Sequence, residues 1–233
     1  MPYKRSRITI DRWRSVQRLE LEFWSRWTTL PPFQNLDIPK YWRQEVAHFG
    51  EAWGCFRGLR VLDVGCGPVG LIHFADHAAE RIRVDSLLPQ YREKLTLGGR
   101  QLSLSAMAES LPLAARSIDL VVCYNALDHM WDPEAALDEM ARVLRPGGAA
   151  LLMVHTFPAG LRPLFWIDRM HPHHYTAPSF SLMVRSRLQV ERCKTVKRHF
   201  ELPAGKWWIP SSWKYRVGGL VVSSTYLRAT KAA

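Results

Sequence analysis

A glycine-rich turn after an apolar run is the segment of this sequence whose residue types most clearly predict chemistry. It spans Val61–Gly70 and carries a G-x-G-x-x-G arrangement that includes Gly65 and Gly67. Glycine lets the backbone turn sharply and lets a ligand approach without a Cβ atom in the way. Pro68 is preset for a first helical turn, so the pattern predicts a strand, then a ligand-binding turn, then a helix.

Asp63 narrows the class of ligand. A turn of this kind would also suit a dinucleotide, but Asp63 stands two residues before Gly65, where its carboxylate would repel a pyrophosphate. The same carboxylate would favour a ligand that carries an ammonium and a sulfonium group. We therefore expect the cofactor to be S-adenosylmethionine (SAM) and not NAD.

A second acid follows the turn at the distance typical of a ribose contact. Asp85 ends the next apolar run and comes 18 positions after Gly67. An acidic residue about 20 positions after such a turn accepts hydrogen bonds from ribose hydroxyls. Asp85 is therefore predicted to bind the cofactor ribose, and the alternative is a solvated carboxylate at a strand end or helix cap.

The pair Asp128-His129 is the first candidate for chemistry on the methyl acceptor. SAM is activated by its sulfonium, so the protein mainly has to orient the acceptor, and a hydroxyl acceptor also needs a base. The pair follows the apolar run 118–124, at the strand edge where ligands bind in such folds. We predict His129 as the base and Asp128 as its orienter or a substrate contact. The alternative is that both residues cap a helix that begins near Pro133.

A histidine-rich segment is the second candidate for the acceptor side. It runs from His171 to Thr176 and includes His174 and Tyr175. The resemblance to methyltransferases named below implies that these three residues form a wall of the acceptor pocket, with His155 as a candidate for its floor. Structural packing is the main alternative and a metal site the lesser one. The segment lacks Cys and contains a Pro, so we expect no metal site.

After Gly58, short apolar runs alternate with longer helical stretches, which predicts a parallel sheet with helices on both faces. We expect strands near 60–64, 81–85, 100–104, 118–124, 149–155, 187–196 and 219–228, and helices near 69–79, 89–97, 133–145 and 177–186. The segment Arg145–Gly148 is expected to be a turn.

Residues 1–56 are predicted to form a helical N-terminal cap on a catalytic domain that spans 57–233 and contains a loop insert at about 200–216. Apolar residues recur at steps of three and four between Asp11 and Trp27, with Asp11 as the expected N-cap. A second helix should begin at Pro39. We expect most tryptophans of this cap to pack in the core, and a minority, with Trp24 as the candidate, to stack on the substrate or to exclude water from the site.

The composition of the chain limits the kinds of substrate and partner that we expect it to bind. The formal charge of +11 favours an acceptor that carries an anionic group, although a basic surface that only serves solubility is the plain alternative. Four scattered cysteines without a C-x-x-C pair indicate a reducing cytoplasm. The sequence contains no run of about 18 apolar residues, so we expect no transmembrane segment. No appended nucleic-acid-binding module is apparent.

Residues 58–156 resemble the class I SAM-dependent methyltransferases, in particular the branch similar to ubiquinone and menaquinone methyltransferases (methyltransferase type 11). Four stretches carry the resemblance in the family's order and spacing: Val61–Gly70, Ala108–Leu113, Ser117–Val122 and Asn125–Gly148. The resemblance implies a Rossmann-like α/β fold with a seven-stranded sheet, mostly parallel with an antiparallel last strand, here the run 219–228.

The resemblance also implies roles for individual residues. Gly65, Cys66 and Gly67 would lie under SAM, Asp63 near its methionine amino group, Asp85 on its ribose, and Asn125 facing the methionine portion. Ala108 would offer its backbone amide to adenine. The family often has Asp where this chain has Met107, so one adenine contact would be missing, and we expect weaker SAM binding, by about 1 kcal/mol.

In similar sugar and small-molecule O-methyltransferases, a histidine at the position of His129 can act as the base. We therefore expect a cytoplasmic SAM-dependent O-methyltransferase that acts on a small molecule or a glycan intermediate. A quinone-like or other aromatic acceptor and RNA are alternatives within the fold. A protein that binds SAM without converting it is the alternative from another class.

Overall fold

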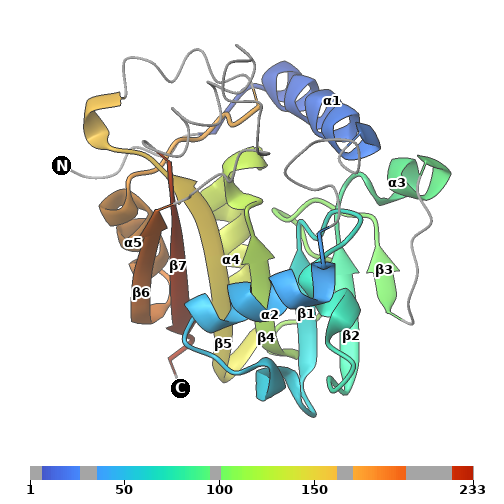
Figure 1. Cartoon of the computed structure of the whole chain (residues 1–233), viewed down its shortest axis with the longest axis vertical. Helices are drawn as coiled ribbons and strands as arrows, with labels where there is room; N and C mark the ends of the chain where they lie inside the picture. The colour runs from blue at the N-terminus through green and yellow to red at the C-terminus, as the bar shows by residue number, and fades with distance from the viewer. Residues whose placement is uncertain (1–6, 27–35, 95–100, 162–169, 198–221, 233) are drawn as a thin grey trace, which may run out of the picture.

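Seven strands form one sheet in the order β3-β2-β1-β4-β5-β7-β6 (Figure 1). The computed structural model describes residues 7–26, 36–94, 101–161, 170–197 and 222–232. The strands are β1 (Arg60–Val64), β2 (Glu80–Val84), β3 (Leu102–Leu104), β4 (Ile118–Tyr124), β5 (Leu144–Thr156), β6 (Gln189–Lys197) and β7 (Ser223–Thr230). The pairings β1–β2, β2–β3, β1–β4 and β4–β5 are parallel. The final strand, β7, runs antiparallel to both β5 and β6, which confirms the predicted Rossmann-like sheet.

Helices cover both faces of this sheet. They are α1 (Ile10–Arg26), α2 (Ile38–His48), α3 (Leu88–Lys94), α4 (Pro133–Val143) and α5 (Ala177–Arg185), with short 3-10 turns η3 (Trp53–Phe56), η4 (Leu71–Phe74) and η5 (Leu127–His129). One core cluster joins the sheet to α4 and α5, and a second joins its opposite face to α2 and η4. Figure 1 shows α1 at the end of the sheet where the parallel strands finish.

The strand order reverses between β1 and β4, because the chain adds β2 and β3 on one side of β1 and β4 and β5 on the other. Ligands in open α/β sheets bind at such a switch point, outside the carboxyl ends of the strands. The glycine turn leaves β1 at this point, so the topology places the predicted cofactor residues at one edge.

Several predicted elements are confirmed. The helices predicted near 89–97, 133–145 and 177–186 appear as α3, α4 and α5. Asp132 caps α4 by accepting a hydrogen bond from Ala135 N, and Pro lies in its first turn. The strand predicted at 219–228 appears as β7. Helices α1 and α2 match the two that were expected in the N-terminal cap, and the loop insert at about 200–216 lies outside the described residues.

The helix predicted over 69–79 is wrong. Only the 3-10 turn η4 is present there, because backbone groups near the end of this segment bond to the two residues before β1 instead of continuing a helix. His77 O accepts from Gly58 N, and Ala79 N donates to Leu59 O. These bonds draw the segment back across the sheet edge and end the turn early.

Two smaller predictions also need correction. Asp11 is not the N-cap of α1, because the helix begins at Ile10 and the Thr9 hydroxyl accepts the hydrogen bond from Arg12 N. The segment Arg145–Gly148 is not a free turn but a bulge inside β5, where the register against β4 shifts. Gly147 has a φ of 72° there, and its amide donates to Lys231 O.

None of the described helices combines the length and the apolar character that crossing a membrane requires.

Candidate functional site

A cavity of about 860 Å³ opens at the carboxyl edge of the parallel strands, between α1 and α2. That volume lies towards the upper end of the range for pockets that take small organic ligands, roughly 300–1,000 Å³. Its walls come from α1, the glycine turn, the end of β2, the segment 106–109, the end of β4 with η5, and from α2, β6 and β7. The cavity therefore joins the predicted cofactor residues to the predicted acceptor residues.

The glycine turn has the backbone conformation that only glycine adopts freely. Gly65 and Gly67 have φ values of 69° and 56°, in the left-handed region. A Cβ atom on Gly65 would lie 2.4 Å from the Ala126 Cβ, and one on Gly67 would lie 3.2 Å from Trp24 Cζ2. Both glycines and Cys66 line the cavity, so the turn lies where a ligand in the cavity could reach its backbone.

Asp85 fixes the turn from the end of β2. Its Oδ2 accepts from Gly67 N at 2.9 Å and its Oδ1 accepts from Leu87 N at 2.8 Å. Each carboxylate oxygen has two lone pairs, so both retain capacity to accept from ribose hydroxyls. Burial raises the pKa of Asp85 to about 6, against the opposing effect of these two amides.

Asp63 lies beneath the turn, and it is not among the residues that line the cavity. Its carboxylate is buried, and its Oδ2 has no hydrogen-bond partner among the described residues. A Cβ atom on Gly70 would come within 2.6 Å of that oxygen. Burial raises the pKa of Asp63 to about 7, while the backbone amides of Ile72 and Leu71 act in the opposite direction.

Met107, Ala108 and Asn125 line the same cavity. Asn125 has a φ of 51°, a strained value for a residue other than glycine, and its Oδ1 is buried without a hydrogen-bond partner in the described structure. A buried carbonyl of this kind is costly unless a ligand satisfies it. An ammonium donor at this point, above a glycine cradle, fits SAM.

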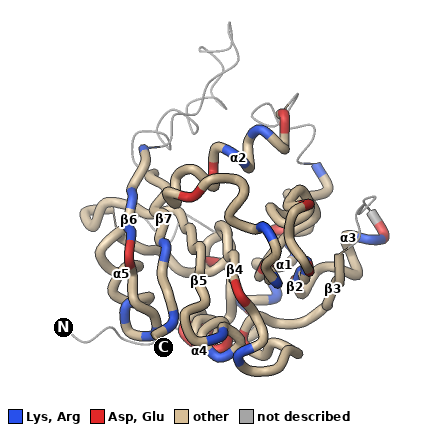
Figure 2. The backbone as a smooth tube through the Cα atoms, turned by 90° about the horizontal axis from the view of Figure 1, so that it is seen from below, with Lys and Arg blue, Asp and Glu red and all other residues tan. Residues whose placement is uncertain are grey.

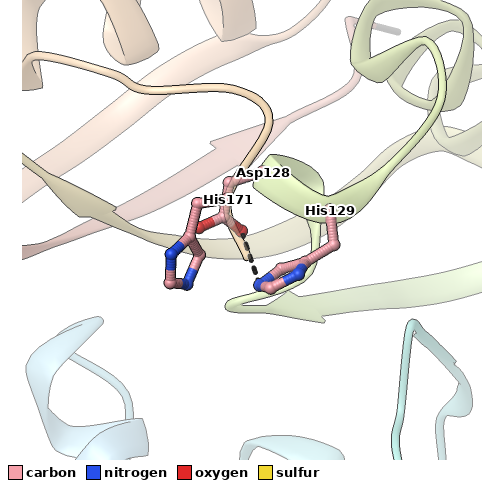
Figure 3. A group of neighbouring side chains, drawn as sticks. All are labelled: Asp128, His129 and His171. Carbon is pink, nitrogen blue, oxygen red and sulfur yellow. Dashed lines mark ion pairs between the residues drawn. The ribbon is translucent and has the colours of Figure 1, made fainter. Parts of the chain in front are cut away.

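His129 occupies the acceptor side of the cavity between two carboxylates. Its Nδ1 lies 3.5 Å from Glu20 Oε2, and its Nε2 lies 3.9 Å from Asp128 Oδ1. Asp128 and His129 both belong to η5 and are buried. Figure 3 shows both side chains turned towards His171, whose ring centroid lies 4.7 Å from that of His129.

The structure brings some of the other predicted acceptor residues to the cavity and not others. Trp24, His155 and His171 line it. His174 packs on Phe157 at a centroid distance of 5.5 Å, and Tyr175 is buried against Phe180. Neither His174 nor Tyr175 is among the lining residues.

Glu20 is a functional candidate to which the sequence analysis gave no role. Its Oε1 accepts from Trp24 Nε1 at 2.9 Å, and its Oε2 faces His129. Gln17, one turn earlier, accepts from the Ser86 hydroxyl next to Asp85. The signal available in the sequence was the spacing of Gln17, Glu20 and Trp24, which places two polar side chains on the same helix face as a tryptophan.

A buried polar network on the α2 side of the cavity was also missed. Glu45 Oε2 accepts from Tyr124 at 2.5 Å and from Tyr226 at 2.6 Å, and the Tyr41 and Tyr124 hydroxyls lie 2.7 Å apart. All four side chains line the cavity. They fix the aromatic rings of Tyr124 on β4 and Tyr226 on β7 in the cavity wall.

Comparison with known proteins shows the family to which the chain belongs. Residues 62–152 match the family described as methyltransferase domain. An uncharacterized methyltransferase of Mycobacteroides abscessus is 32% identical over 182 residues, which cover 66% of this chain and 70% of that protein. A ubiquinone biosynthesis O-methyltransferase of Paracidovorax citrulli is 33% identical over 103 residues, 40% of this chain and 42% of that protein.

Among solved structures, a SAM-dependent methyltransferase of Thermotoga maritima superimposes with a TM-score of 0.61 at 18% identity, over 94% of this chain and 99% of that one. At this identity the likeness shows the fold. Apart from the Mycobacteroides protein, the chain spans less than half the length of the curated relatives it matches first, at 44%, 44% and 47%.

The raised pKa values of Asp63 and Asp85 predict opposite pH trends for stability and for SAM binding. The folded protein keeps protons that the unfolded chain has lost between pH 3.8 and about 7, so its stability falls as pH rises through this window. SAM affinity should rise, about tenfold between pH 5 and pH 8, because ionised carboxylates favour a cationic ligand. Thermal melts and titrations at each pH check both trends, and a flat SAM affinity would contradict the assignment.

The Gly67 backbone predicts a sharp substitution effect. Gly67→Ala should raise the dissociation constant for SAM at least about tenfold and cost about 1 kcal/mol of stability, because alanine is strained at this φ. Gly54→Ala is the matched control, since a Cβ there meets nothing within 4 Å. Equal SAM affinity in both variants, measured by calorimetry, would rule out close contact between SAM and the turn.

Proposed function

The chain belongs to the family of SAM-dependent methyltransferases, and we propose that it transfers the SAM methyl group to a hydroxyl of a small molecule or a glycan intermediate. The observation that carries the choice of a hydroxyl is His129, a cavity-lining imidazole between Glu20 and Asp128. A hydroxyl must lose its proton as it attacks, whereas an amine or a carbanion makes different demands on the site.

His129 is the base in this proposal. Its Nε2 takes the hydroxyl proton, and Glu20 Oε2 at 3.5 Å from Nδ1 stabilises the imidazolium that forms. Asp128 holds the acceptor hydroxyl or orients the ring. The oxygen then attacks the SAM methyl carbon, the carbon–sulfur bond breaks, and the sulfonium leaves as a neutral thioether.

The cofactor roles carried over from the sequence remain our proposal. Asp85 holds the ribose, Met107 and Ala108 face the adenine, and Asn125 accepts from the methionine amino group through its unpartnered Oδ1. Gly65, Cys66 and Gly67 form the floor. Asp63, one layer below, acts on the ammonium through its field and by holding the turn that carries Gly70.

The part of the cavity lined by Tyr41, Trp42 and Tyr124, which we call the acceptor lobe, has aromatic walls that suit a ring-shaped substrate. Trp42 and Tyr124 pack edge to face at 4.9 Å, and Tyr41 packs on both. Aromatic walls of this kind stack on sugars and on aromatic rings alike. They therefore also support the second candidate, a quinone-like or other aromatic acceptor, which the relative from ubiquinone biosynthesis favours.

Cations near the far end of the lobe support an acceptor with an anionic group. Lys194 Nζ lies 3.1 Å from His48 Nδ1, and His48 and Lys197 line the cavity. RNA as the acceptor receives less support. In Figure 2, Lys and Arg are scattered over several elements and interleaved with Asp and Glu, without forming one continuous stripe.

Replacing His129 tests the proposal and separates it from a protein that only binds SAM. His129→Ala should lower methyl transfer at least about 100-fold, the usual contribution of a general base, with less than about a twofold change in SAM affinity. His77→Ala is the control, because His77 is exposed and is not among the residues that line the cavity. Acceptors are first found by scanning sugars, phenols and quinols with labelled SAM.

Unchanged turnover in His129→Ala would refute the base assignment. If the wild-type protein binds SAM and never converts it with any acceptor on the panel, the binding-only alternative holds instead.

A further inference from the structure

Asp128, His129 and His171 converge on one point of the cavity wall (Figure 3), and from this geometry we propose that they bind a divalent transition-metal ion. Each offers one ligand atom, and these atoms lie within 4.8 Å of one another. The inference deepens the proposed methyl transfer to a hydroxyl and rests on it. It departs from the sequence-based expectation of no metal, which considered the histidine-rich segment alone.

Asp128 is the first reason to place a cation here. Its carboxylate is 1% exposed, and its Oδ1 has no hydrogen-bond partner in the described part of the chain. Among the described residues, the basic group paired with this carboxylate is His129 Nε2 at 3.9 Å, too far for a hydrogen bond. Buried charges are normally paired or coordinate a metal, so this oxygen requires a partner that the neighbouring side chains do not supply.

Glu20 gives His129 the environment of a metal ligand. Metal-binding histidines usually present their second ring nitrogen to a carboxylate, which holds the proton on that nitrogen and leaves the other as the ligand. Here Glu20 Oε2 lies 3.5 Å from Nδ1, which is buried and has no hydrogen-bond partner among the described residues, so Glu20 is the carboxylate placed to take that role. Nε2 is turned towards Asp128 and His171. The outer carboxylate is itself held by Trp24 Nε1.

Two contacts of His173, two residues further along the chain, hold the segment that carries His171 at this point. His173 N donates to Asp128 O at 3.3 Å, and the His173 Nε2 lies 2.8 Å from Met130 O. These bonds tie the histidine segment to the same turn that carries the other two ligands. The His171 ring then packs edge-on to His129, with 64° between the rings.

The donor set selects the class of ion. Two imidazole nitrogens and one carboxylate oxygen suit Zn²⁺, Co²⁺, Ni²⁺ or Fe²⁺, whereas Mg²⁺ and Ca²⁺ prefer oxygen ligands throughout. Three protein ligands leave at least one coordination position for a small molecule, as in catalytic zinc sites. His129 and His171 line the cavity, so that position opens towards the acceptor.

A cation at this point would change how the acceptor hydroxyl is ionised. A bound ion would favour loss of the hydroxyl proton to water near neutral pH, because a cation stabilises the negative charge on the oxygen. The ionised oxygen would then take the methyl group, and the sulfonium would become a thioether as before. His129 Nε2 is a ligand in this state and no longer a base, so metal and proton compete for the same atom.

Titration of the untagged 233-residue chain with Co²⁺, followed by visible absorption and by competition with Zn²⁺, tests the site directly. We expect one Co²⁺ per chain, with Asp128→Asn and His171→Ala each weakening binding at least about tenfold, and Glu20→Gln by about 10–100-fold through the outer shell. His174→Ala, from the same segment but packed on Phe157, should bind Co²⁺ as the wild type does. SAM titrations on each variant report whether it is folded.

Two results would overturn the proposal: no stoichiometric Co²⁺ binding, or binding that survives in Asp128→Asn and His171→Ala, as it would at the exposed thiol of Cys193. Methyl transfer measured with and without a chelator is read separately. If turnover persists in protein that does not bind Co²⁺, the metal proposal is wrong and the proposed methyl transfer to a hydroxyl is unaffected. Absence of any SAM-dependent transfer, with or without metal, removes the proposed function itself.

Discussion

The hydrogen bond from the Gly67 amide to Asp85 Oδ2 joins the glycine turn to the carboxyl end of β2, and the rest of the site depends on it. The turn leaves β1 with Gly65 and Gly67 in the left-handed conformation, and its amides donate to the neighbouring strand β2 and to Asp85. Val84 O accepts from Gly65 N, and Asp85 accepts from Gly67 N. The neighbouring parallel strand therefore sets the shape of the turn, and the sheet positions the ligand surface.

Around this bond the interior of the site is acidic although the whole chain is basic. Asp63, Asp85, Asp128 and Glu20 are gathered near the switch point, whereas the formal charge of the chain is +11. Burial raises the pKa of Asp63 and Asp85 and so records the cost of holding their charge away from water. A cationic cofactor, and a metal ion at Asp128, would each offset part of that cost, which accounts for acids in a cavity where a dinucleotide phosphate would be repelled.

The sheet and the cofactor turn could be predicted because their signals are local. An apolar run that enters a glycine turn, and an acid at the end of the next run, each lie within about twenty residues. The short η4 could not be predicted, because bonds to Gly58 and Leu59 from outside the segment end it. The partnership of Glu20 with His129 depends on how α1 docks on the end of the sheet. The residue pattern within α1 does not predict where the helix packs on the sheet, although the polar side chains beside Trp24 indicated a polar contact on that face.

The central claim is that this cavity binds SAM through the end of β2, and calorimetric titration with SAM, S-adenosylhomocysteine and NAD tests it most directly. The wild-type protein should bind both sulfur compounds and not NAD. Asp85→Ala should weaken both, while Asp76→Ala, an exposed carboxylate paired with Arg81, should not. Absence of binding by either sulfur compound, or NAD binding of comparable strength, would contradict the account.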